Sequence, residues 1–174
     1  MADDLAQCIN RVSRLEGSFV LRSGQHATHY FDKYRFEADP ALLRRIARRM
    51  LDLLPSNTEV LAGLELGGVP IATAMSLESG LPAVFVRKEA KTYGTCQAIE
   101  GGGVKDRRTV IIEDVISTGG AVADAAVLLR GEGANLIGVV CAIWRGDGGP
   151  RINALPDLVV SPALTEADLK SCGD

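Results

Sequence analysis

The sequence predicts an α/β fold, in which a mainly parallel β-sheet is covered by helices on both faces. Short apolar runs with strand character alternate with helical segments along most of the chain. The 174 residues, 47% of them hydrophobic and 24% charged, are enough for one domain with a full core. No repeat, low-complexity tract or linker divides the chain, so we expect a single domain over residues 1–174.

The N-terminal segment predicts a helix followed by two short strands. Residues 3–15 form the helix, because apolar residues recur on one helical face. Strands are expected over 18–21 and 28–32, on either side of a turn at 23–25. The apolar face of the expected helix consists of Leu5, Cys8, Ile9 and Val12.

The clearest helix of the sequence follows this hairpin and begins at Pro40. Asp39 is expected to cap it, and proline fits the first helical position because its missing N–H has no partner there anyway. Pro55 follows the end of the helix. The expected buried stripe consists of Leu43, Ile46, Ala47, Met50 and Leu54.

From residue 59 onward the pattern is that of strands joined by crossover helices. A loop with three glycines, 63–68, joins the first of these strands to a helix that starts at Pro70, and a second helix is expected over 120–129. Residues 88–103 are polar and have neither helical nor strand periodicity, which is typical of a functional loop such as a lid. The expected strands cover 59–62, 83–86, 109–112, 137–144 and 158–161.

Composition and charge exclude several classes of protein. The formal net charge is −3, which argues against a generally basic nucleic-acid-binding protein. No apolar run approaches the roughly 20 residues of a membrane span, and the acidic start of the chain does not resemble a signal peptide. The four cysteines form no Cys-x-x-Cys pair, so we expect reduced thiols and a cytoplasmic protein.

The segment Val110–Ala121, VIIEDVISTGGA, carries the most chemical information. An apolar strand is expected to end in Glu113 and Asp114, before a Ser-Thr-Gly-Gly turn and a helix. Carboxylates at the carboxyl end of a strand face the crevice where open α/β sheets bind ligands. Small residues at a helix N-terminus bind anions. The combination suits a ligand with hydroxyls and a phosphate; in the alternative interpretation, Asp114 and Ser117 merely cap an ordinary helix.

Other phosphate-binding motifs are missing. Residues 63–68 run into Val69-Pro70 and therefore do not form a Gly-x-x-x-x-Gly-Lys-Ser/Thr motif, and no Gly-x-Gly-x-x-Gly follows a strand. The sequence thus argues against a P-loop ATPase and a dinucleotide-dependent dehydrogenase.

Residues 110–121 closely resemble the phosphoribosyl pyrophosphate (PRPP) motif of type I phosphoribosyltransferases, and further segments resemble the orotate phosphoribosyltransferases in particular. Residues 17–24 with His29-Tyr30-Phe31-Asp32 are similar to that family's N-terminal hood over the base. Residues 87–94 and 99–101 resemble its catalytic loop, and 63–70 its pyrophosphate loop. The resemblance implies a type I phosphoribosyltransferase fold, with residues 1–37 in the hood and 88–103 as a mobile catalytic loop.

The resemblance also implies roles for individual residues. Lys91, Glu113 and Asp114 would be catalytic, with the two acids on the ribose hydroxyls and the turn after them on the 5-phosphate. The implied PRPP-binding residues are Arg22, Arg87, Lys88, Lys91, Tyr93, Glu113, Asp114, Val115, Ile116, Ser117, Thr118, Gly119, Gly120 and Ala121. The implied orotate-binding residues are Tyr30, Phe31, Ser117 and Arg145.

Three positions depart from the family pattern. Tyr93 stands where well-known members have histidine, and Gly67 stands where some members have lysine in the pyrophosphate loop. Glu113 replaces the commoner aspartate and keeps the charge on a longer arm. None of these changes removes a group that the chemistry requires.

The implied activity is transfer of the phosphoribosyl group from PRPP to orotate, giving orotidine 5′-phosphate and pyrophosphate in de novo pyrimidine (UMP) biosynthesis. Mg²⁺ would be the cofactor, held mainly through PRPP rather than by protein ligands. The implied assembly is a homodimer in which each subunit lends its loop to the other. Two alternatives stay open: a non-catalytic sensor of PRPP or nucleotides on the same fold, and a phosphoribosyltransferase for another base.

Overall fold

A mainly parallel sheet forms the centre of the structure, a computed structural model that describes residues 4–20, 24–89 and 98–171. Its strands are β3 (Val60–Leu64), β4 (Ala83–Val86), β5 (Ile99–Glu100), β6 (Arg108–Ile116), β7 (Asn135–Trp144) and β8 (Val160–Thr165). Their order is β5-β4-β3-β6-β7-β8, and the short edge strand β5 runs antiparallel to its neighbour while the others run parallel. The predicted mainly parallel sheet is confirmed.

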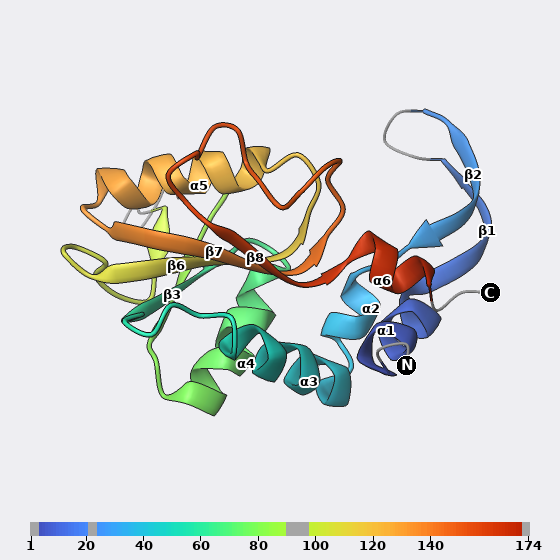
Figure 1. Ribbon diagram of the computed structural model, residues 1–174, viewed down its shortest axis with the longest axis horizontal. Helices are drawn as coiled ribbons and strands as arrows, with labels where there is room; N and C mark the ends of the chain where they lie inside the picture. Colours follow the sequence, from blue (N-terminus) through green and yellow to red (C-terminus); the bar gives the residue numbers. More distant parts are fainter. Residues whose placement is uncertain (1–3, 21–23, 90–97, 172–174) are drawn as a thin grey trace.

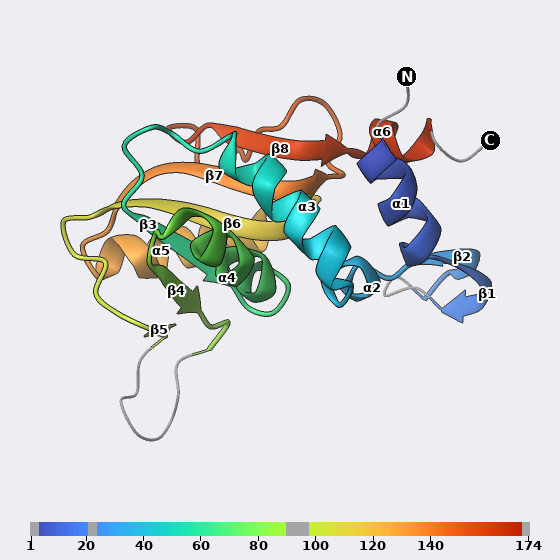
Figure 2. The ribbon, with the colours of Figure 1, turned by 90° about the horizontal axis from the view of Figure 1, so that it is seen from below.

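Helices cover both faces of this sheet (Figures 1 and 2). Along each strand the side chains alternate between the two faces, as strand geometry requires. Leu61 and Ile112 pack into the core shared with two helices on one face, and Ile111 packs into the core shared with a third helix on the other. The helices of the first face are α3 (Pro40–Leu51) and α4 (Gly68–Ser79), and α5 (Gly120–Gly131) covers the opposite face.

The N-terminal region forms a separate hairpin beside the main sheet (Figure 1). Its elements, with the last helix of the chain that lies nearby, are α1 (Asp4–Ser13), β1 (Arg14–Val20), β2 (His26–Phe31), α2 (Tyr34–Glu37) and α6 (Glu166–Lys170). The hairpin strands are antiparallel, and Leu5 and Ile9 of α1 are buried in the core that contains α3. The predicted helix and hairpin are confirmed, although both strands begin earlier than expected.

Helix α3 begins where the sequence predicts. Asp39 Oδ1 accepts hydrogen bonds from the backbone N–H groups of Ala41 and Leu42, at 2.9 and 3.0 Å. The predicted stripe needs correction, because Leu42 rather than Leu43 lies at its buried centre. Leu42 precedes the fully buried Ile46 by four residues, so both lie on one helical face. Leu54, also predicted in the stripe, comes after the end of the helix and is half-buried.

Two expectations about strand ends are wrong. The apolar strand does not end at the two acids, because β6 continues through Ile116, which pairs with Trp144 of β7. Continued pairing with a long parallel neighbour extends the strand. The loop expected over 88–103 also contains regular structure, since Ile99 is buried and pairs with Val86 as part of β5. The last strand, β8, lies slightly later than the predicted 158–161.

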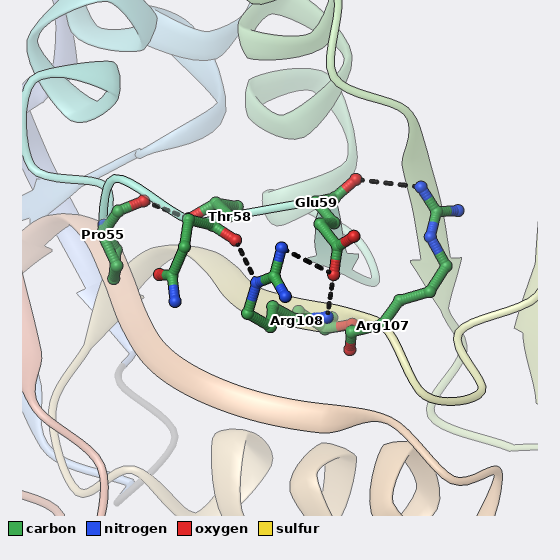
Figure 3. A network of polar contacts seen from close by, with 7 residues as sticks. Pro55, Thr58, Glu59, Arg107 and Arg108 are labelled. Atoms are coloured by element: carbon green, nitrogen blue, oxygen red, sulfur yellow. Dashed lines mark hydrogen bonds and ion pairs between the residues drawn. The ribbon is translucent and has the colours of Figure 1, made fainter.

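A polar network fixes the amino ends of β3 and β6 against each other (Figure 3). Glu59 Oε2 accepts a hydrogen bond of 2.9 Å from the backbone N–H of Arg108 and lies 3.4 Å from its guanidinium. Arg107 donates to the backbone oxygen of Glu59 at 3.1 Å, and Arg108 Nε donates to the backbone oxygen of Asn57 at 2.7 Å. These contacts set the two strands side by side, so that their opposite ends also meet.

None of the helices in the described part of the chain is long and apolar enough to cross a membrane.

Candidate active site

Polar residues follow the carboxyl ends of several parallel strands and therefore meet at one edge of the sheet. Glu65 follows β3, Arg87 follows β4 and Arg145 follows β7, while Glu113 and Asp114 lie near the end of β6. The carboxyl edge of an open parallel sheet is where such folds bind ligands. The predicted acids and two of the predicted cations thus lie along this edge.

The two acids are buried, and residues of α2 cover them. Glu113 is 7% exposed and Asp114 is fully buried. Glu113 Oε1 accepts a hydrogen bond of 2.9 Å from the backbone N–H of Asp114. Lys33, which precedes α2, places its Nζ 2.5 Å from Asp114 Oδ2. Glu37, one turn after Lys33, is also buried and interacts with Asp114.

Burial and mutual repulsion divide the protons unequally within this cluster. Desolvation, followed by the hydrogen bond to Asp114 and its charge, raises the pKa of Glu113 to about 9. Desolvation and the charge of Asp114 raise the pKa of Glu37 to about 8. Burial opposes the ionisation of Asp114, but hydrogen bonds from Glu113 and Lys33 outweigh it and lower its pKa. At neutral pH the cluster therefore holds one ionised carboxylate, Asp114, beside one ammonium.

Lys33 and Glu37 were not predicted as site residues. Their spacing of four residues puts them on one side of a helical turn, which was a signal available in the sequence. Nothing local, however, indicated that this turn would pack on β6, because that contact joins segments far apart in the chain.

The loop after β3 approaches Asp114 closely at Gly67. A Cβ atom built on Gly67 would overlap the Asp114 carboxyl group, far inside van der Waals contact with its Oδ2. Glycine at this position therefore allows the buried carboxylate to lie against the loop backbone. The loop is also tied to β4, since Glu65 Oε2 accepts a hydrogen bond of 3.1 Å from the backbone N–H of Lys88.

A tight turn of three residues, Ser117–Gly119, joins β6 to α5. Gly119 has φ +80°, a left-handed conformation that glycine adopts without steric cost. A Cβ there would come 2.6 Å from the side chain of Ile152, so packing also demands glycine. The first N–H groups of α5 have no acceptor within the helix and carry its positive dipole end, which suits a phosphate. Gly120 and Ala121, predicted in the turn, begin this helix.

Two open pockets are lined by residues of this turn or of the start of α5. One, of about 420 Å³, is lined by Glu65, Arg87, Lys88, Gly120 and Ala121 among others. The other, of about 450 Å³, is lined by Ser117–Gly120 together with Arg151 and Asn153. Arg87 Nε is buried without a hydrogen-bond partner among the described residues, so it is available to an anion in the first pocket.

Arg145 and the hairpin meet at the other side of the two acids. The guanidinium of Arg145 lies over the ring of Phe31, 5.6 Å from its centroid, and pairs with Glu166 Oε1 at 3.1 Å. The backbone N–H of Arg145 donates to the backbone oxygen of Ile116 at 2.8 Å, which holds Arg145 beside Ser117. The structure thus brings together three of the four residues predicted to bind orotate.

The remaining predicted site residues are placed differently. Tyr30 is 46% exposed, and its ring packs on Phe19 with the centroids 5.5 Å apart. Val115 and Ile116 belong to β6, and the Ile116 side chain is buried in the core. Arg22, Lys91 and Tyr93 lie outside the described residues.

The donor set offers little for a metal held by the protein alone. The described residues contain no group of three or more His, Cys, Asp or Glu side chains that could hold a metal ion. Two of the three carboxyls near β6 are protonated by their surroundings, and the third is paired with Lys33. This chemistry fits a Mg²⁺ ion that is carried by phosphate oxygens of a ligand and retains its waters.

Comparison with known proteins agrees with this geometry. Residues 35–167 match the phosphoribosyl transferase domain. An orotate phosphoribosyltransferase from Nocardioides sp. is 58% identical over 95% of this chain and 92% of its own length. The structure of the orotate phosphoribosyltransferase of Mycobacterium tuberculosis in complex with Fe(III) dicitrate superposes with a TM-score of 0.85, at 31% identity over 95% of this chain and 97% of that one. The structure of that enzyme in complex with PRPP gives a TM-score of 0.82, at 28% identity over 96% and 97% of the two chains.

The matched domain and the fold define a phosphoribosyl transferase enzyme. Within that class, the chain belongs to the orotate phosphoribosyltransferases. The identification agrees with the resemblance carried by residues 110–121, by the hairpin and by the loop that follows β4.

Proposed function

We propose that the chain transfers the phosphoribosyl group of PRPP to orotate, with release of pyrophosphate, in de novo pyrimidine biosynthesis. The observation that carries this proposal is the buried pair Glu113 and Asp114 at the carboxyl edge of β6, next to the Ser117–Gly119 turn. The acids can bind hydroxyl groups and the turn can bind a phosphate. Because the turn directly follows the strand that carries the acids, the pair suits a ribose 5-phosphate group. The PRPP complex of the M. tuberculosis relative supports the same ligand.

The acids would bind the two ribose hydroxyls. Asp114 is ionised and would accept hydrogen bonds, whereas Glu113 carries a proton and can donate as well as accept. The 5-phosphate would lie on the N–H groups at the start of α5. This arrangement would fix the ribose 5-phosphate group at the carboxyl end of β6.

Cations would stabilise the departing pyrophosphate. Breaking the bond at C1 gives an oxocarbenium-like transition state and places negative charge on the leaving group, where fixed cations stabilise it most. Arg87 and Lys88 line the pocket on this side, and Lys91 would join them from the loop. Mg²⁺ bound to the PRPP oxygens would supply further positive charge there.

Orotate would lie between the hairpin and the end of β7. Arg145 would pair with its carboxylate, with Phe31, Tyr30 and Ser117 around the base. Because Arg145 already pairs with Glu166, the carboxylate would have to share or replace that partner. The specificity for orotate therefore rests on an arginine whose orientation is held from two sides, by Glu166 and by the ring of Phe31.

We also propose a cytoplasmic homodimer whose subunits exchange the loop that carries Lys91. Lys91→Ala and Arg145→Ala subunits, each inactive as homodimers, can be mixed under conditions that allow exchange. If Lys91 acts across the interface, one site of each mixed dimer contains both defects and the other contains neither, so about a quarter of all sites regain activity. Proven exchange without any recovery would mean that the loop serves its own subunit.

The activity is tested by following the absorbance of orotate with Mg²⁺ and PRPP, in parallel with uracil, adenine and hypoxanthine. We expect loss of orotate with equal release of pyrophosphate, and negligible reaction of the other bases. Equal or better reaction with a purine would overturn the orotate assignment. PRPP binding without turnover of any base would instead favour a sensor.

A further inference from the structure

Lys33 is the residue of this site whose position the activity alone does not explain. Its Nζ lies 2.5 Å from Asp114 Oδ2, on a carboxylate that is fully buried. The Lys33 side chain itself is 33% exposed, so its flexible stem reaches the acid from the solvent side. The ammonium also lies 5.3 Å from the ring centroid of Tyr34, the first residue of α2.

The same carboxylate oxygen touches the loop after β3. The ammonium of Lys33 lies within 2.5 Å of Asp114 Oδ2. A Cβ atom built on Gly67 would also lie within 2.5 Å of this oxygen. Gly67 itself brings no charge to this loop, and the next cations along the chain, Arg87 and Lys88, follow β4. A positive charge thus reaches the junction between the ribose acids and the loop from the N-terminal region.

We propose that Lys33 is a pyrophosphate-binding residue that Asp114 holds in place until PRPP arrives. This role rests on the proposed function. When the ribose hydroxyls donate to Asp114, they replace its ion pair with Lys33. The ammonium then lies beside Gly67 and turns to the nearest anion, the pyrophosphate group of the same ligand.

The alternative role is purely structural, in that Lys33 neutralises a buried acid and does nothing else. Breaking such a pair leaves an uncompensated buried charge, which would weaken every ligand that depends on Asp114. The two roles differ in which ligand suffers. A structural lysine affects all ligands of the ribose site equally, whereas a pyrophosphate contact affects only ligands that carry pyrophosphate.

The test compares Lys33→Gln with the wild-type protein by calorimetric titration of PRPP, Mg²⁺-pyrophosphate and ribose 5-phosphate. We expect the dissociation constants of PRPP and pyrophosphate to rise on the order of 10- to 100-fold, the usual effect of losing a hydrogen bond to a charged group. Ribose 5-phosphate should bind within about threefold of wild type or tighter, because its hydroxyls no longer displace an ammonium.

Two further variants act as controls. Lys33→Arg keeps the charge and should recover most of the PRPP affinity. Lys105→Gln removes a lysine that lies before β6, at the opposite end of the sheet, and should leave all three affinities unchanged. Thermal unfolding of each variant shows that the compared proteins are folded.

Equal weakening of PRPP and ribose 5-phosphate in Lys33→Gln would overturn the proposed role, as would unchanged binding of all three ligands. Both results leave the proposed function intact if the wild-type protein binds PRPP. A wild-type protein that does not bind PRPP would overturn the proposed function and this role together.

Discussion

The two ends of strand β6 both carry charged groups, but they balance those charges in different ways. At the amino end, Arg108 meets the carboxylate of Glu59, while Arg107 and Arg108 Nε donate to the backbone oxygens of Glu59 and Asn57 (Figure 3). The side chains are part-exposed, with 42% for Arg108 and 38% for Glu59. All of these contacts join donors and acceptors of the protein itself.

At the carboxyl end, three carboxyl groups surround one ammonium and are almost completely buried. Glu37, Glu113 and Asp114 share Lys33, and protons on two of the acids make up the difference in charge. Such an arrangement is costly for stability, because buried acids lose hydration that the protein replaces only in part.

The difference separates a structural network from a binding site. At the amino end, the contacts are made within the protein, without a ligand. This network therefore serves to align β3 with β6. The carboxyl end has donors and acceptors that a ligand with hydroxyls and phosphates would satisfy. Substitutions at the carboxyl end should therefore affect ligand binding and turnover, and those at the amino end should affect stability.

The largest effect should come from the loop lysine that the resemblance places at the carboxyl end. Lys91→Ala should reduce kcat by about 10²-fold or more, since a preorganised charge on the leaving group acts mainly in the transition state. Steady-state kinetics with orotate measure the loss, and Lys105→Ala at the amino end is the control. A kcat within a few-fold of wild type would show that Lys91 is an ordinary surface lysine.

A matched pair of glycines at the two ends of α5 sharpens the comparison further. Gly119 and Gly133 both have φ +80°, but a Cβ on Gly119 would meet Ile152 at 2.6 Å, whereas one on Gly133 would meet the flexible Lys105 side chain at 3.1 Å. Gly119→Ala should cost roughly 2–4 kcal/mol of unfolding free energy and Gly133→Ala about 1–2 kcal/mol. Urea unfolding measures both. PRPP affinity should fall in Gly119→Ala alone, and an equal fall in both would contradict the role of the turn.

The pH dependence of stability should reveal the protons held at the carboxyl end. Since the pKa of Glu113 is raised from 4.5 to about 9 and that of Glu37 to about 8, the folded protein retains protons that the unfolded chain releases. Their contribution is complete below pH 4.5 and is lost as the pH rises toward 9. Glu113→Gln should therefore make the decline in unfolding free energy between about pH 6 and pH 9 distinctly shallower. If the unfolding free energies of the wild type and Glu113→Gln changed in parallel with pH, the protons assigned to Glu113 and Glu37 would be contradicted.

The smallest effect should come from the amino end itself. Glu59→Gln weakens a part-exposed ion pair and should lower the unfolding free energy by about 1 kcal/mol or less. Its kcat/KM with PRPP and orotate should stay within about twofold of wild type, because the network touches no part of the candidate site. A large loss of turnover without a loss of stability would mean that the amino end communicates with the site.

Local patterns in the sequence predicted much of the fold and part of the site. The cap at Asp39, the alternation of strands and helices, and the turn before α5 depend on neighbouring residues, and the structure has all three. Contacts between distant segments were not predictable in this way. The Lys33–Asp114 pair and the Arg145–Glu166 pair exist because α2 packs against β6 and because β8 lies beside β7.

The extension of β6 past the acids has the same origin. Val115 and Ile116 continue the strand because they pair with Ile143 and Trp144, and this pairing buries Ile116. From the local sequence alone, an apolar pair between two acids and a glycine-containing turn is predicted to belong to a loop. The partner strand decides the outcome, and its register is a tertiary property.

The most direct test of the account is a calorimetric titration of PRPP into Asp114→Asn and Glu59→Gln, each compared with wild type at the same pH and Mg²⁺ concentration. The two variants make the same chemical change, loss of a carboxylate charge, at opposite ends of the sheet. We expect Asp114→Asn to weaken PRPP binding on the order of 10-fold or more, and Glu59→Gln to leave it unchanged. Unchanged binding in Asp114→Asn, or equal weakening in both variants, would contradict the assignment of the ribose site to the carboxyl end of β6.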